Sequence, residues 1–567
     1  MFLRALRKRK VHLYGMMALA ALFFLLCLPL LPSVSRWRGD ERFYTDAVIG
    51  MAQSGDYLTP TYSDGALRFK KPILSYWVVL LSYKALGVNY LASRLPFLVA
   101  GTLVVGLTYW FALTLIRRRP EALVASAVMA SNLTVFHTAI RSTPDMLLTL
   151  FILISMIGFA HVIFRQSRSA WHYGMAFLGV ALAVATKGLF GLLPLIFVVG
   201  YVHIAKPPGV RLRDLTHVPV LIIALPVACF WFILAFALHG GAAFSDFWGD
   251  QVGERFSGSK FYMLSNAGVY LASFILQMLP WSAGVLVVLY QAWRRKVPLF
   301  FSHRREALFA AGWLLFLYGI FIFGNIQRTR YFLPAYPHLS VLLALLLCAG
   351  FRIRSARTIL VNLFRGLCWC VAGWGLVLVV GGVRMHFGLV FAGLIFSALS
   401  FYLISRFNRW APALVLAGFG ALLLILFTVT DILVRPVFFL SPAPAMSREL
   451  LALCPSGTSV AMKGVSLNYV SQVRVLSGGV VRPVDVTEGV TAEEIARYPF
   501  LVCPLSEYQD QISGTGGIVG RAVGISGWRP RDFLALASER RRASVWAARR
   551  QEYVIVSRSS CPAPSGP

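Results

Sequence analysis

The stretch DERFYTDAVIGMAQSGDYLTP, residues 40–60, is acidic and polar, and it follows directly on a strongly apolar segment. A further apolar segment begins at residue 72. A carboxylate held beside a membrane is costly unless it has a partner or a task. Asp40 and Glu41, which open the stretch, are therefore the first candidates for function, and the segments around them decide the fold.

Composition places the chain in a membrane. Of its 567 residues, 58% are hydrophobic and 14% are charged, and the mean hydropathy is +0.70. Soluble domains carry about 25% charged residues. Lys and Arg number 54 against 23 Asp and Glu, but they occur in short runs between apolar segments, as in cytoplasmic loops. We predict an α-helical integral membrane protein without a nucleic-acid partner.

Thirteen apolar stretches approach the roughly 20 residues that span a bilayer. They lie at 13–34, 94–116, 121–139, 146–165, 171–187, 189–206, 216–238, 272–293, 306–324, 332–350, 360–381, 386–404 and 410–430. With thirteen crossings, the main basic clusters lie on the same side of the membrane. These clusters are at 7–10, 117–119, 165–168, 206–213, 294–296, 352–357 and 406–409. The positive-inside rule makes that side the cytoplasm, with the N-terminus in it. Asp40, Asp145, Lys187 and everything after residue 435 then face outward.

The segment 72–87, PILSYWVVLLSYKALG, is apolar but short and contains Lys84. If it crossed the membrane, the cluster at 117–119 would lie outside. It is therefore predicted to lie along the outer interface as an amphipathic helix. The region 1–435 is expected to form the transmembrane domain, including an outer loop at 35–93 with interfacial helices.

From residue 440 to 567 the composition becomes that of a soluble domain. Short β-type runs (TSVAMKGV, PFLVCPL, YVIVSRS) alternate with helical patterns (AMSRELLAL, TAEEIARY, RDFLALASERRRAS). The pattern predicts a small α/β domain outside the membrane. Its glycine-rich piece GTGGIVGR, residues 514–521, lacks the Lys-Ser/Thr ending of a phosphate-binding loop and is predicted to be an ordinary turn.

Three outward carboxylates are candidates for chemistry. Asp40 and Glu41 are either solvated loop residues or a general base for an acceptor hydroxyl group. Asp145, in RSTPDMLL, is either a helix cap or a functional residue at membrane depth.

A set of outward cations is the second group of candidates. Each alone is explained by snorkelling or by lipid headgroups, but gathered around one cavity they would bind the phosphate of a lipid. The set comprises Lys70, Lys71, Lys187, Arg255, Arg328 and Arg330. Carboxylates beside such a cluster suggest group transfer from a lipid-phosphate carrier.

Several of these stretches together resemble a known family. The first loop, RGDERFYTDAVIGMAQSGDYLTPTYSDGALRFKKPILSYWVVLLSYKALG, is followed by SRLPFLVAG, RSTPDMLLTLF, ATKGLFGLLP, MLPW and RTRYFLPAYP. They are similar to the bacterial dolichyl-phosphate-mannose-protein mannosyltransferase-like group, and especially to its 4-amino-4-deoxy-L-arabinose lipid A transferases. The similarity covers most of residues 1–350.

This resemblance implies a GT-C fold and a function. It implies inverting transfer of one sugar from a polyprenyl-phosphate donor to a lipid, glycan or protein, on the periplasmic side of the bacterial inner membrane. Asp40 matches the family's acceptor-side Asp, and Asp145 matches a second important Asp. Lys71 and Lys187 match lysines near the donor phosphate.

The sequence departs from these transferases at two positions. Their Glu before the lysine of the EKP motif and their His in a later loop, which share a metal, correspond here to Lys70 and Val252. No metal or other cofactor is therefore predicted, although a divalent metal stays an open alternative. Lipid A and aminoarabinose are correspondingly weak expectations.

Two other functions compete with this one. A transporter or flippase of lipid-linked sugars would also need cations near phosphates, but it needs polar residues through the bilayer depth. An O-antigen ligase would concentrate its motifs in a large later loop. The charges of this chain crowd the outer ends of the spans and the first loop, which favours a glycosyltransferase.

Overall fold

The computed structural model of the protein forms two compact units. It describes residues 2–34, 39–62, 65–249, 260–297, 303–323, 329–385, 387–406, 410–433, 440–487, 497–509, 517–525 and 539–557. The first unit comprises Met1–Leu28, Phe69–Ser75 and Phe97–Val429, and the second comprises Pro29–Arg68, Tyr76–Pro96 and Thr430–Pro567. The boundary predicted near residue 435 stays a prediction.

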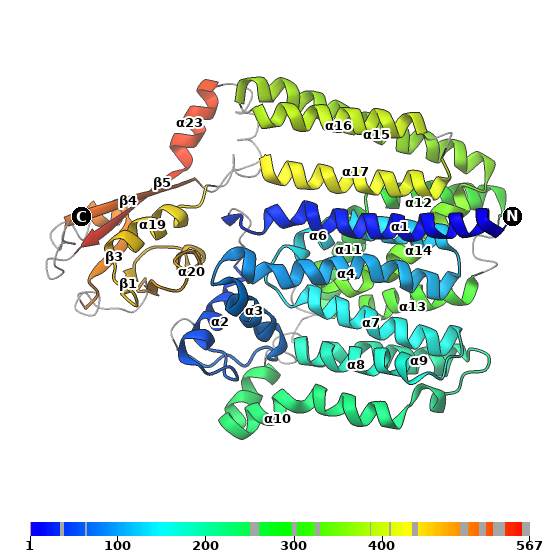
Figure 1. Ribbon diagram of the computed structural model, residues 1–567, viewed down its shortest axis with the longest axis horizontal. Helices are drawn as coiled ribbons and strands as arrows, with labels where there is room; N and C mark the ends of the chain where they lie inside the picture. The colour runs from blue at the N-terminus through cyan, green and yellow to red at the C-terminus, as the bar shows by residue number, and fades with distance from the viewer. Residues whose placement is uncertain are drawn as a thin grey trace. The chain divides into compact units, whose positions relative to one another are not determined.

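The first unit consists of helices that lie side by side (Figure 1). They are α1 (Phe2–Cys27), α4 (Tyr90–Ile116), α5 (Arg119–Ala130), α6 (Leu133–Ala139), α7 (Asp145–Phe164), α8 (Ala170–Lys187), α9 (Leu193–Ala205), α10 (Val218–Trp248), α11 (Lys260–Gln277), α12 (Trp281–Arg295), α13 (Arg304–Ile322), α14 (Tyr336–Gly350), α15 (Arg354–Met385), α16 (Phe387–Arg406) and α17 (Pro412–Leu433). Short 3-10 turns η1 (Leu28–Leu30), η3 (Gly188–Leu192), η4 (Leu212–Leu215) and η6 (Thr329–Ala335) connect some of them.

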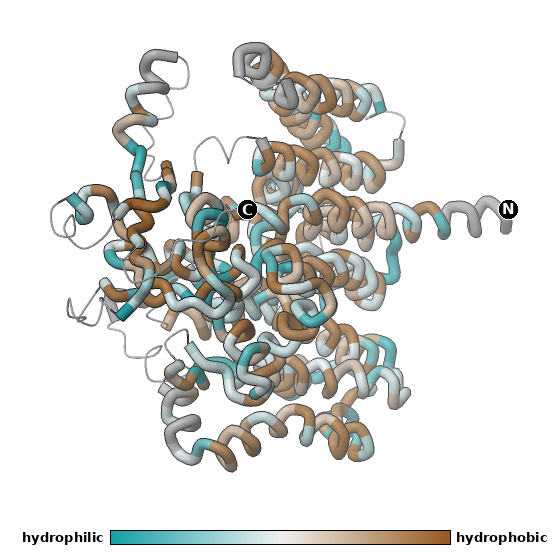
Figure 2. The backbone as a smooth tube through the Cα atoms, turned by 60° about the vertical axis from the view of Figure 1, so that its left-hand side comes forward, coloured by the Kyte–Doolittle hydropathy of each residue, from teal (hydrophilic) through white to brown (hydrophobic). Residues whose placement is uncertain are grey.

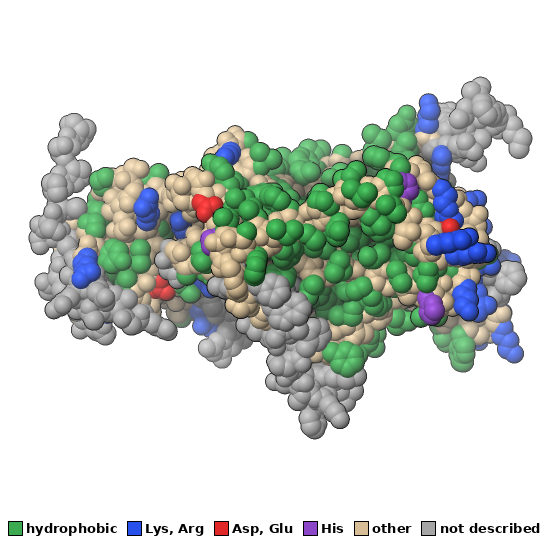
Figure 3. Space-filling model, turned by 90° about the horizontal axis from the view of Figure 1, so that it is seen from below, with side chains coloured by type: hydrophobic (Ala, Val, Ile, Leu, Met, Phe, Trp, Pro, Cys, Tyr) green, Lys and Arg blue, Asp and Glu red, His purple; other side chains and the backbone are tan. Residues whose placement is uncertain are grey.

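These helices confirm a multi-pass membrane protein. Within the described residues, nine helices are long and apolar enough to cross a membrane, or up to eleven if each of two bent pairs is one span. Their apolar character is visible along the tubes of Figure 2. On the face drawn in Figure 3, hydrophobic side chains form a broad band and Lys and Arg gather beyond one end of it.

The predicted count of thirteen is not confirmed, and two places account for its difference from the upper count of eleven. The predicted spans 171–187 and 189–206 are counted as one segment, Ala170–Ala205. The predicted span 386–404 is counted only as a shorter apolar helix, Val390–Arg406. Gly188 has φ 66° and ψ −133°, so α8 ends before it. A Cβ on Gly191 would lie 2.2 Å from the Val184 nitrogen, so η3 folds back onto the end of α8.

Close packing of α7 on α8 positions the ends of both helices. A Cβ added to Gly158 of α7 would lie 2.4 Å from the Ala176 nitrogen, and one added to Gly179 of α8 would lie 2.7 Å from the Ser155 nitrogen. Real Cβ atoms do not approach backbone so closely, so glycine is what lets the two backbones meet. The last residue of α8, Lys187, is thereby brought to the first residue of α7, Asp145.

The second unit combines part of the first loop with the C-terminal region. Its helices are α2 (Arg42–Ser54), most of α3 (Leu74–Leu86), α19 (Ala443–Leu453), α20 (Leu467–Leu476), α22 (Leu505–Glu507) and α23 (Glu539–Arg549). The strands are β1 (Ser459–Met462), β2 (Arg482–Asp485), β3 (Phe500–Pro504), β4 (Gly517–Ile525) and β5 (Arg550–Ser557), in the order β2-β1-β3-β5-β4. Strands β2, β1 and β3 are parallel, while β5 is antiparallel to both β3 and β4.

This sheet with its helices confirms the small α/β domain. The three predicted β-type runs correspond to β1, β3 and β5. The predicted turn in the glycine-rich piece is wrong from Gly517 onward, because these residues pair with β5 as strand β4; residues 514–516 lie outside the described residues. Residues 491–496 of the predicted helical pattern at 491–498 and residues 531–538 of the pattern at 531–544 also lie outside the described part, while residues 539–544 belong to α23.

Helix α3 has the length expected of an interfacial element. Its 13 residues make a helix of about 20 Å at 1.5 Å per residue, short of the roughly 30 Å hydrocarbon core. Within the second unit, α2 packs on α20, and the Gln53 side chain donates a hydrogen bond to the Gly479 carbonyl at 2.9 Å. This contact joins the first loop to the C-terminal region.

Candidate active site

One carboxylate of the first unit lies among cations. The Lys187 Nζ donates a hydrogen bond to Asp145 Oδ1, and Arg330 Nε lies 3.4 Å from Asp145 Oδ2 as an ion pair. The Asp145 and Lys187 side chains are only 5% and 6% exposed, and that of Arg330 is 21% exposed. Two cations therefore share one carboxylate in a largely dehydrated place, where charge interactions are strong.

Local sequence explains why each of these side chains is there. Asp145 is the first residue of α7, after Pro144, so its carboxylate also meets the positive end of the helix dipole. Lys187 ends α8 because Gly188 leaves the helix. Arg330 lies in η6, just before α14 begins at Tyr336. The ends of two long helices and a 3-10 turn thus supply the three charged groups.

Lys71 joins this cluster from the segment Phe69–Ser75. Its side chain is buried, its ammonium acts electrostatically on Asp145, and it donates a hydrogen bond to the Lys70 carbonyl at 2.9 Å. The segment is anchored at both ends. The ring of Phe69 lies 4.9 Å from that of His239, and the Ser75 hydroxyl bonds to the Thr186 carbonyl at 3.4 Å.

The cluster has an excess of positive charge. In the described ranges of the chain, Lys71, Lys187 and Arg330 surround one carboxylate, that of Asp145. The Lys187 ammonium also lies 4.7 Å above the ring of Tyr331, a cation–π contact. Buried cations in excess over carboxylates are chemically suited to bind an anion such as a phosphate. The structure therefore brings together four of the predicted site residues: Lys71, Asp145, Lys187 and Arg330. The adjacent Lys70 is half-buried.

Two predicted acidic residues belong to the second unit. Asp40 is half-buried, just before α2. Glu41 is fully buried and pairs with Arg94, whose Nε lies 2.8 Å from Glu41 Oε2. Arg94 also donates to the carbonyls of Leu31 and Ser33, at 2.8 Å each. Glu41 thus has the surroundings of a structural ion pair that fixes the start of the loop.

Sequence reasoning missed a third carboxylate, Asp46 in α2. The Ser471 hydroxyl donates to Asp46 Oδ1 at 2.7 Å, across the α2–α20 contact. Burial raises the pKa of Asp46 to about 6, against the opposing effect of Arg474. A cavity of about 230 Å³ lined in part by Arg42, Asp46 and Ser471 lies beside it. The position of Asp46 on the buried face of the amphipathic helix α2 was the sequence signal that could have identified this carboxylate.

Three residues named in the sequence predictions are not described by the structure. Arg255, Arg328 and Val252 lie outside the described part of the chain. Among the residues that the structure describes, no group of three His, Cys, Asp or Glu side chains gathers as a metal site requires. The absence of a bound metal in the protein stays a prediction.

Sequence relatives support the predicted resemblance. The sequence model of the dolichyl-phosphate-mannose-protein mannosyltransferase family matches residues 12–249. An uncharacterised protein of Aquifex aeolicus is 27% identical over 310 residues, which are 54% of this chain and 59% of that protein. An undecaprenyl phosphate-alpha-4-amino-4-deoxy-L-arabinose arabinosyl transferase of Yersinia pestis is 28% identical over 333 residues, 58% of each chain. The chain thus matches less than two thirds of the length of these relatives.

Solved structures agree over nearly the whole chain. The crystal structure of ArnT from Cupriavidus metallidurans bound to undecaprenyl phosphate matches 97% of this chain and 98% of its own, with a TM-score of 0.70 and 18% identity. Its apo form gives a TM-score of 0.67 at 17% identity. Likeness at this identity establishes the fold. The protein is therefore a multi-pass membrane protein with the GT-C fold, similar in sequence to the mannosyltransferase-like group and its aminoarabinose transferases.

Proposed function

We propose that the protein is an inverting glycosyltransferase. It moves a single sugar from a polyprenyl-phosphate donor to a lipid, glycan or protein acceptor, on the periplasmic side of the bacterial inner membrane. The observation that carries this proposal is the cluster of Lys71, Lys187 and Arg330 around Asp145. The names of the Yersinia and Cupriavidus relatives, which act with or bind undecaprenyl phosphate carriers, support the donor class.

The cations would hold the donor phosphate. As the bond between the sugar's anomeric carbon and the phosphate oxygen breaks, its electron pair stays on the phosphate and the negative charge there grows. Fixed cations in a dry site stabilise that charge more in the transition state than in the ground state. Asp145 keeps Lys187 and Arg330 aligned, and its negative charge offsets part of the cost of holding the Lys187 ammonium in a buried place.

The acceptor side needs a base. We assign this role to Asp40, the half-buried residue before α2. The acceptor oxygen forms its bond to the anomeric carbon on the face opposite the leaving phosphate, and its proton passes to the carboxylate. Attack from the opposite face inverts the configuration. We assign Glu41 a supporting role beside Asp40, because its carboxylate pairs with Arg94.

A flippase of lipid-linked sugars is the weaker alternative. Such a protein needs polar groups along the bilayer depth. Asp145 and Lys187 instead lie at the terminal residues of α7 and α8, and Arg330 lies in a 3-10 turn before α14. That placement suits a reaction at one membrane surface.

The proposal is tested by sugar transfer in membranes and by mass spectrometry of envelope glycolipids, glycans and glycoproteins from a deletion strain. We expect one sugar to be missing from one product class. We expect Asp40→Asn to abolish transfer while expression and donor binding persist, whereas Asp56→Asn, an exposed carboxylate of the same loop, leaves transfer intact. Wild-type turnover by Asp40→Asn removes Asp40 from the mechanism, and an unchanged envelope in the deletion strain contradicts the transferase function.

A further inference from the structure

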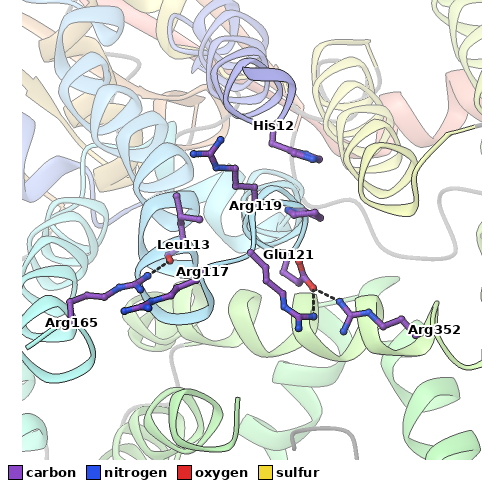
Figure 4. Close-up of a pocket in the computed structure, with 9 residues that line it drawn as sticks. His12, Leu113, Arg117, Arg119, Glu121, Arg165 and Arg352 are labelled. Atoms are coloured by element: carbon purple, nitrogen blue, oxygen red, sulfur yellow. Dashed lines mark hydrogen bonds and ion pairs between the residues drawn. The ribbon is translucent and has the colours of Figure 1, made fainter. Parts of the chain in front are cut away.

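A second charged hollow lies at the other end of the first unit. It has a volume of about 640 Å³ and is lined by residues of α1, of the α4–α5 connection, of the end of α7 and of the turn after α14 (Figure 4). Arg165 in its wall follows the last residue of α7, whose first residue is Asp145. A helix of 20 residues is about 30 Å long, so this hollow is a bilayer's thickness from the candidate active site.

The described residues that line the hollow carry an excess of positive charge. Five arginines line it, against one carboxylate, Glu121. Glu121 is already shared, because Arg352 lies 2.6 Å and Arg118 3.5 Å from its Oε1. Arg165 donates to the Leu113 carbonyl at 2.8 Å.

The two remaining arginines, Arg117 and Arg119, have neither an ion pair nor a side-chain hydrogen bond among the described residues. The buried Nδ1 of His12, in the same wall, also lacks a hydrogen-bond partner within the described part of the chain. A buried polar atom such as this one is rarely left unsatisfied, and the exposed Arg117 and half-buried Arg119 offer further donors, so the hollow is suited to a ligand that accepts hydrogen bonds and carries negative charge.

An apolar hollow adjoins the charged one. It has a volume of about 580 Å³ and shares His12, Pro120, Glu121 and Arg352 with it. The rest of its wall is mainly apolar and includes Phe351, Ala411 and Leu414. A charged hollow and an apolar hollow with a common wall match the two parts of an amphiphile. The general preference of basic loops for the cytoplasm explains the arginines, but it does not explain this pairing.

We propose that this pair of hollows binds an anionic phospholipid of the leaflet that the basic clusters face. Its phosphate lies among Arg117, Arg119 and Arg165, and an acyl chain covers the apolar wall near Phe351 and Leu414. Basic pockets between transmembrane helices on the cytoplasmic side bind acidic lipid headgroups in this way. The site is independent of the sugar-transfer reaction and would tie the helices α1, α5, α14 and α17 together.

Native mass spectrometry of the purified full-length protein tests the headgroup part. The probes are phosphatidylglycerol, phosphatidylcholine with the same acyl chains, and inorganic phosphate. We expect phosphatidylglycerol to be retained preferentially. Replacing both unpaired arginines (Arg117→Ala with Arg119→Ala) should weaken its binding roughly 30-fold, since each basic residue near the surface contributes about a factor of five. Lysine at both positions should keep most of the binding.

A matched control changes charge outside the hollow. Arg294→Ala with Arg295→Ala removes two exposed arginines from the last turn of α12, and should leave phosphatidylglycerol binding unchanged. The proposal is overturned if both double variants behave alike, or if the two lipids are retained equally.

A second variant separates a lipid from a free phosphate. Ala411 is exposed in the apolar wall, so Ala411→Trp fills that hollow without crowding the core. We expect it to weaken phosphatidylglycerol binding about tenfold. If it leaves phosphatidylglycerol binding intact while inorganic phosphate competes fully, the site binds phosphate alone and the lipid assignment is wrong.

Discussion

At the scale of single residues, the buried charges of the candidate site and of the first loop form ion pairs. The Asp145 carboxylate forms ion pairs with Lys187 and Arg330, and the Glu41 carboxylate forms an ion pair with Arg94. Such buried pairs gain little net stability, because dehydration of both charges offsets their attraction, but loss of one partner is severe. Site chemistry and structural support therefore have to be separated by experiment.

A double-mutant cycle on Asp145 and Lys187 makes that separation. Asp145→Asn should lower the free energy of unfolding by about 3–5 kcal/mol, because it removes the carboxylate that pairs with the buried Lys187 ammonium. Lys187→Met in the same chain should restore much of that stability but not sugar transfer. Thermal unfolding in detergent and a transfer assay give the two measurements. Recovery of transfer in the double variant would show that the pair is structural only.

Asp46 predicts a pH-dependent contact within the second unit. Burial raises the pKa of Asp46 from 3.8 to about 6, so between these values the folded chain holds a proton that the unfolded chain has released. Its stabilising contribution is full below about pH 4 and is lost as the pH rises through about 6, by up to roughly 3 kcal/mol. Hydrogen exchange of α2 and α20, corrected for intrinsic rates, should rise over this window.

The control variants for this contact lie in the same cavity wall. Asp46→Asn should remove the dependence on pH, while Asp485→Asn, an exposed carboxylate of that wall, should keep it. Equal exchange in the wild type at pH 4.5 and pH 7, after correction, would contradict the assignment to Asp46.

At the scale of elements, the pair α7 and α8 is what assembles the cluster. Glycine inside a helix costs about 0.5–1 kcal/mol relative to alanine. Gly158 and Gly179 lie where the two helix backbones are in contact, so the destabilisation by glycine is the condition for this close approach. The close approach brings Lys187 beside Asp145.

Two identical substitutions on α8 test this packing. Gly179→Ala places a Cβ 2.7 Å from the Ser155 nitrogen, and it should destabilise by about 1–3 kcal/mol and reduce sugar transfer. Gly174→Ala meets nothing within 4 Å, and should stabilise slightly through helix propensity. Opposite shifts in the thermal midpoint are expected, and shifts of the same sign would rule out the packing argument.

At the scale of the whole molecule, the number of crossings sets which surface each end faces. An odd count puts the two ends of the helical region on opposite sides, as the basic clusters require. With each of the two bent pairs counted as one span, the described residues contain eleven candidate spans, and these become the predicted thirteen if α8 and α9 cross separately and α16 crosses as well.

Fusion proteins check this count directly. Alkaline phosphatase, which is active only outside the cytoplasm, should be active when fused after residue 557 and inactive when fused after Lys296. The reverse should hold for a fluorescent protein that matures only in the cytoplasm. Alkaline phosphatase activity at both junctions would mean that an even number of spans separates them, and would break the proposed sidedness.

Some of this protein is determined by local sequence. Hydropathy and basic runs are properties of neighbouring residues, so the membrane class, the small α/β domain and the candidate charges could be predicted. Which polar and charged side chains pair with one another was decided only by the tertiary structure. Lys187 lies 42 residues from Asp145 along the chain, and Ser471 lies 425 residues from Asp46. Contacts between residues so far apart in the chain depend on how the helices pack. The residues next to a charged group in the sequence therefore do not indicate which distant group will neutralise it.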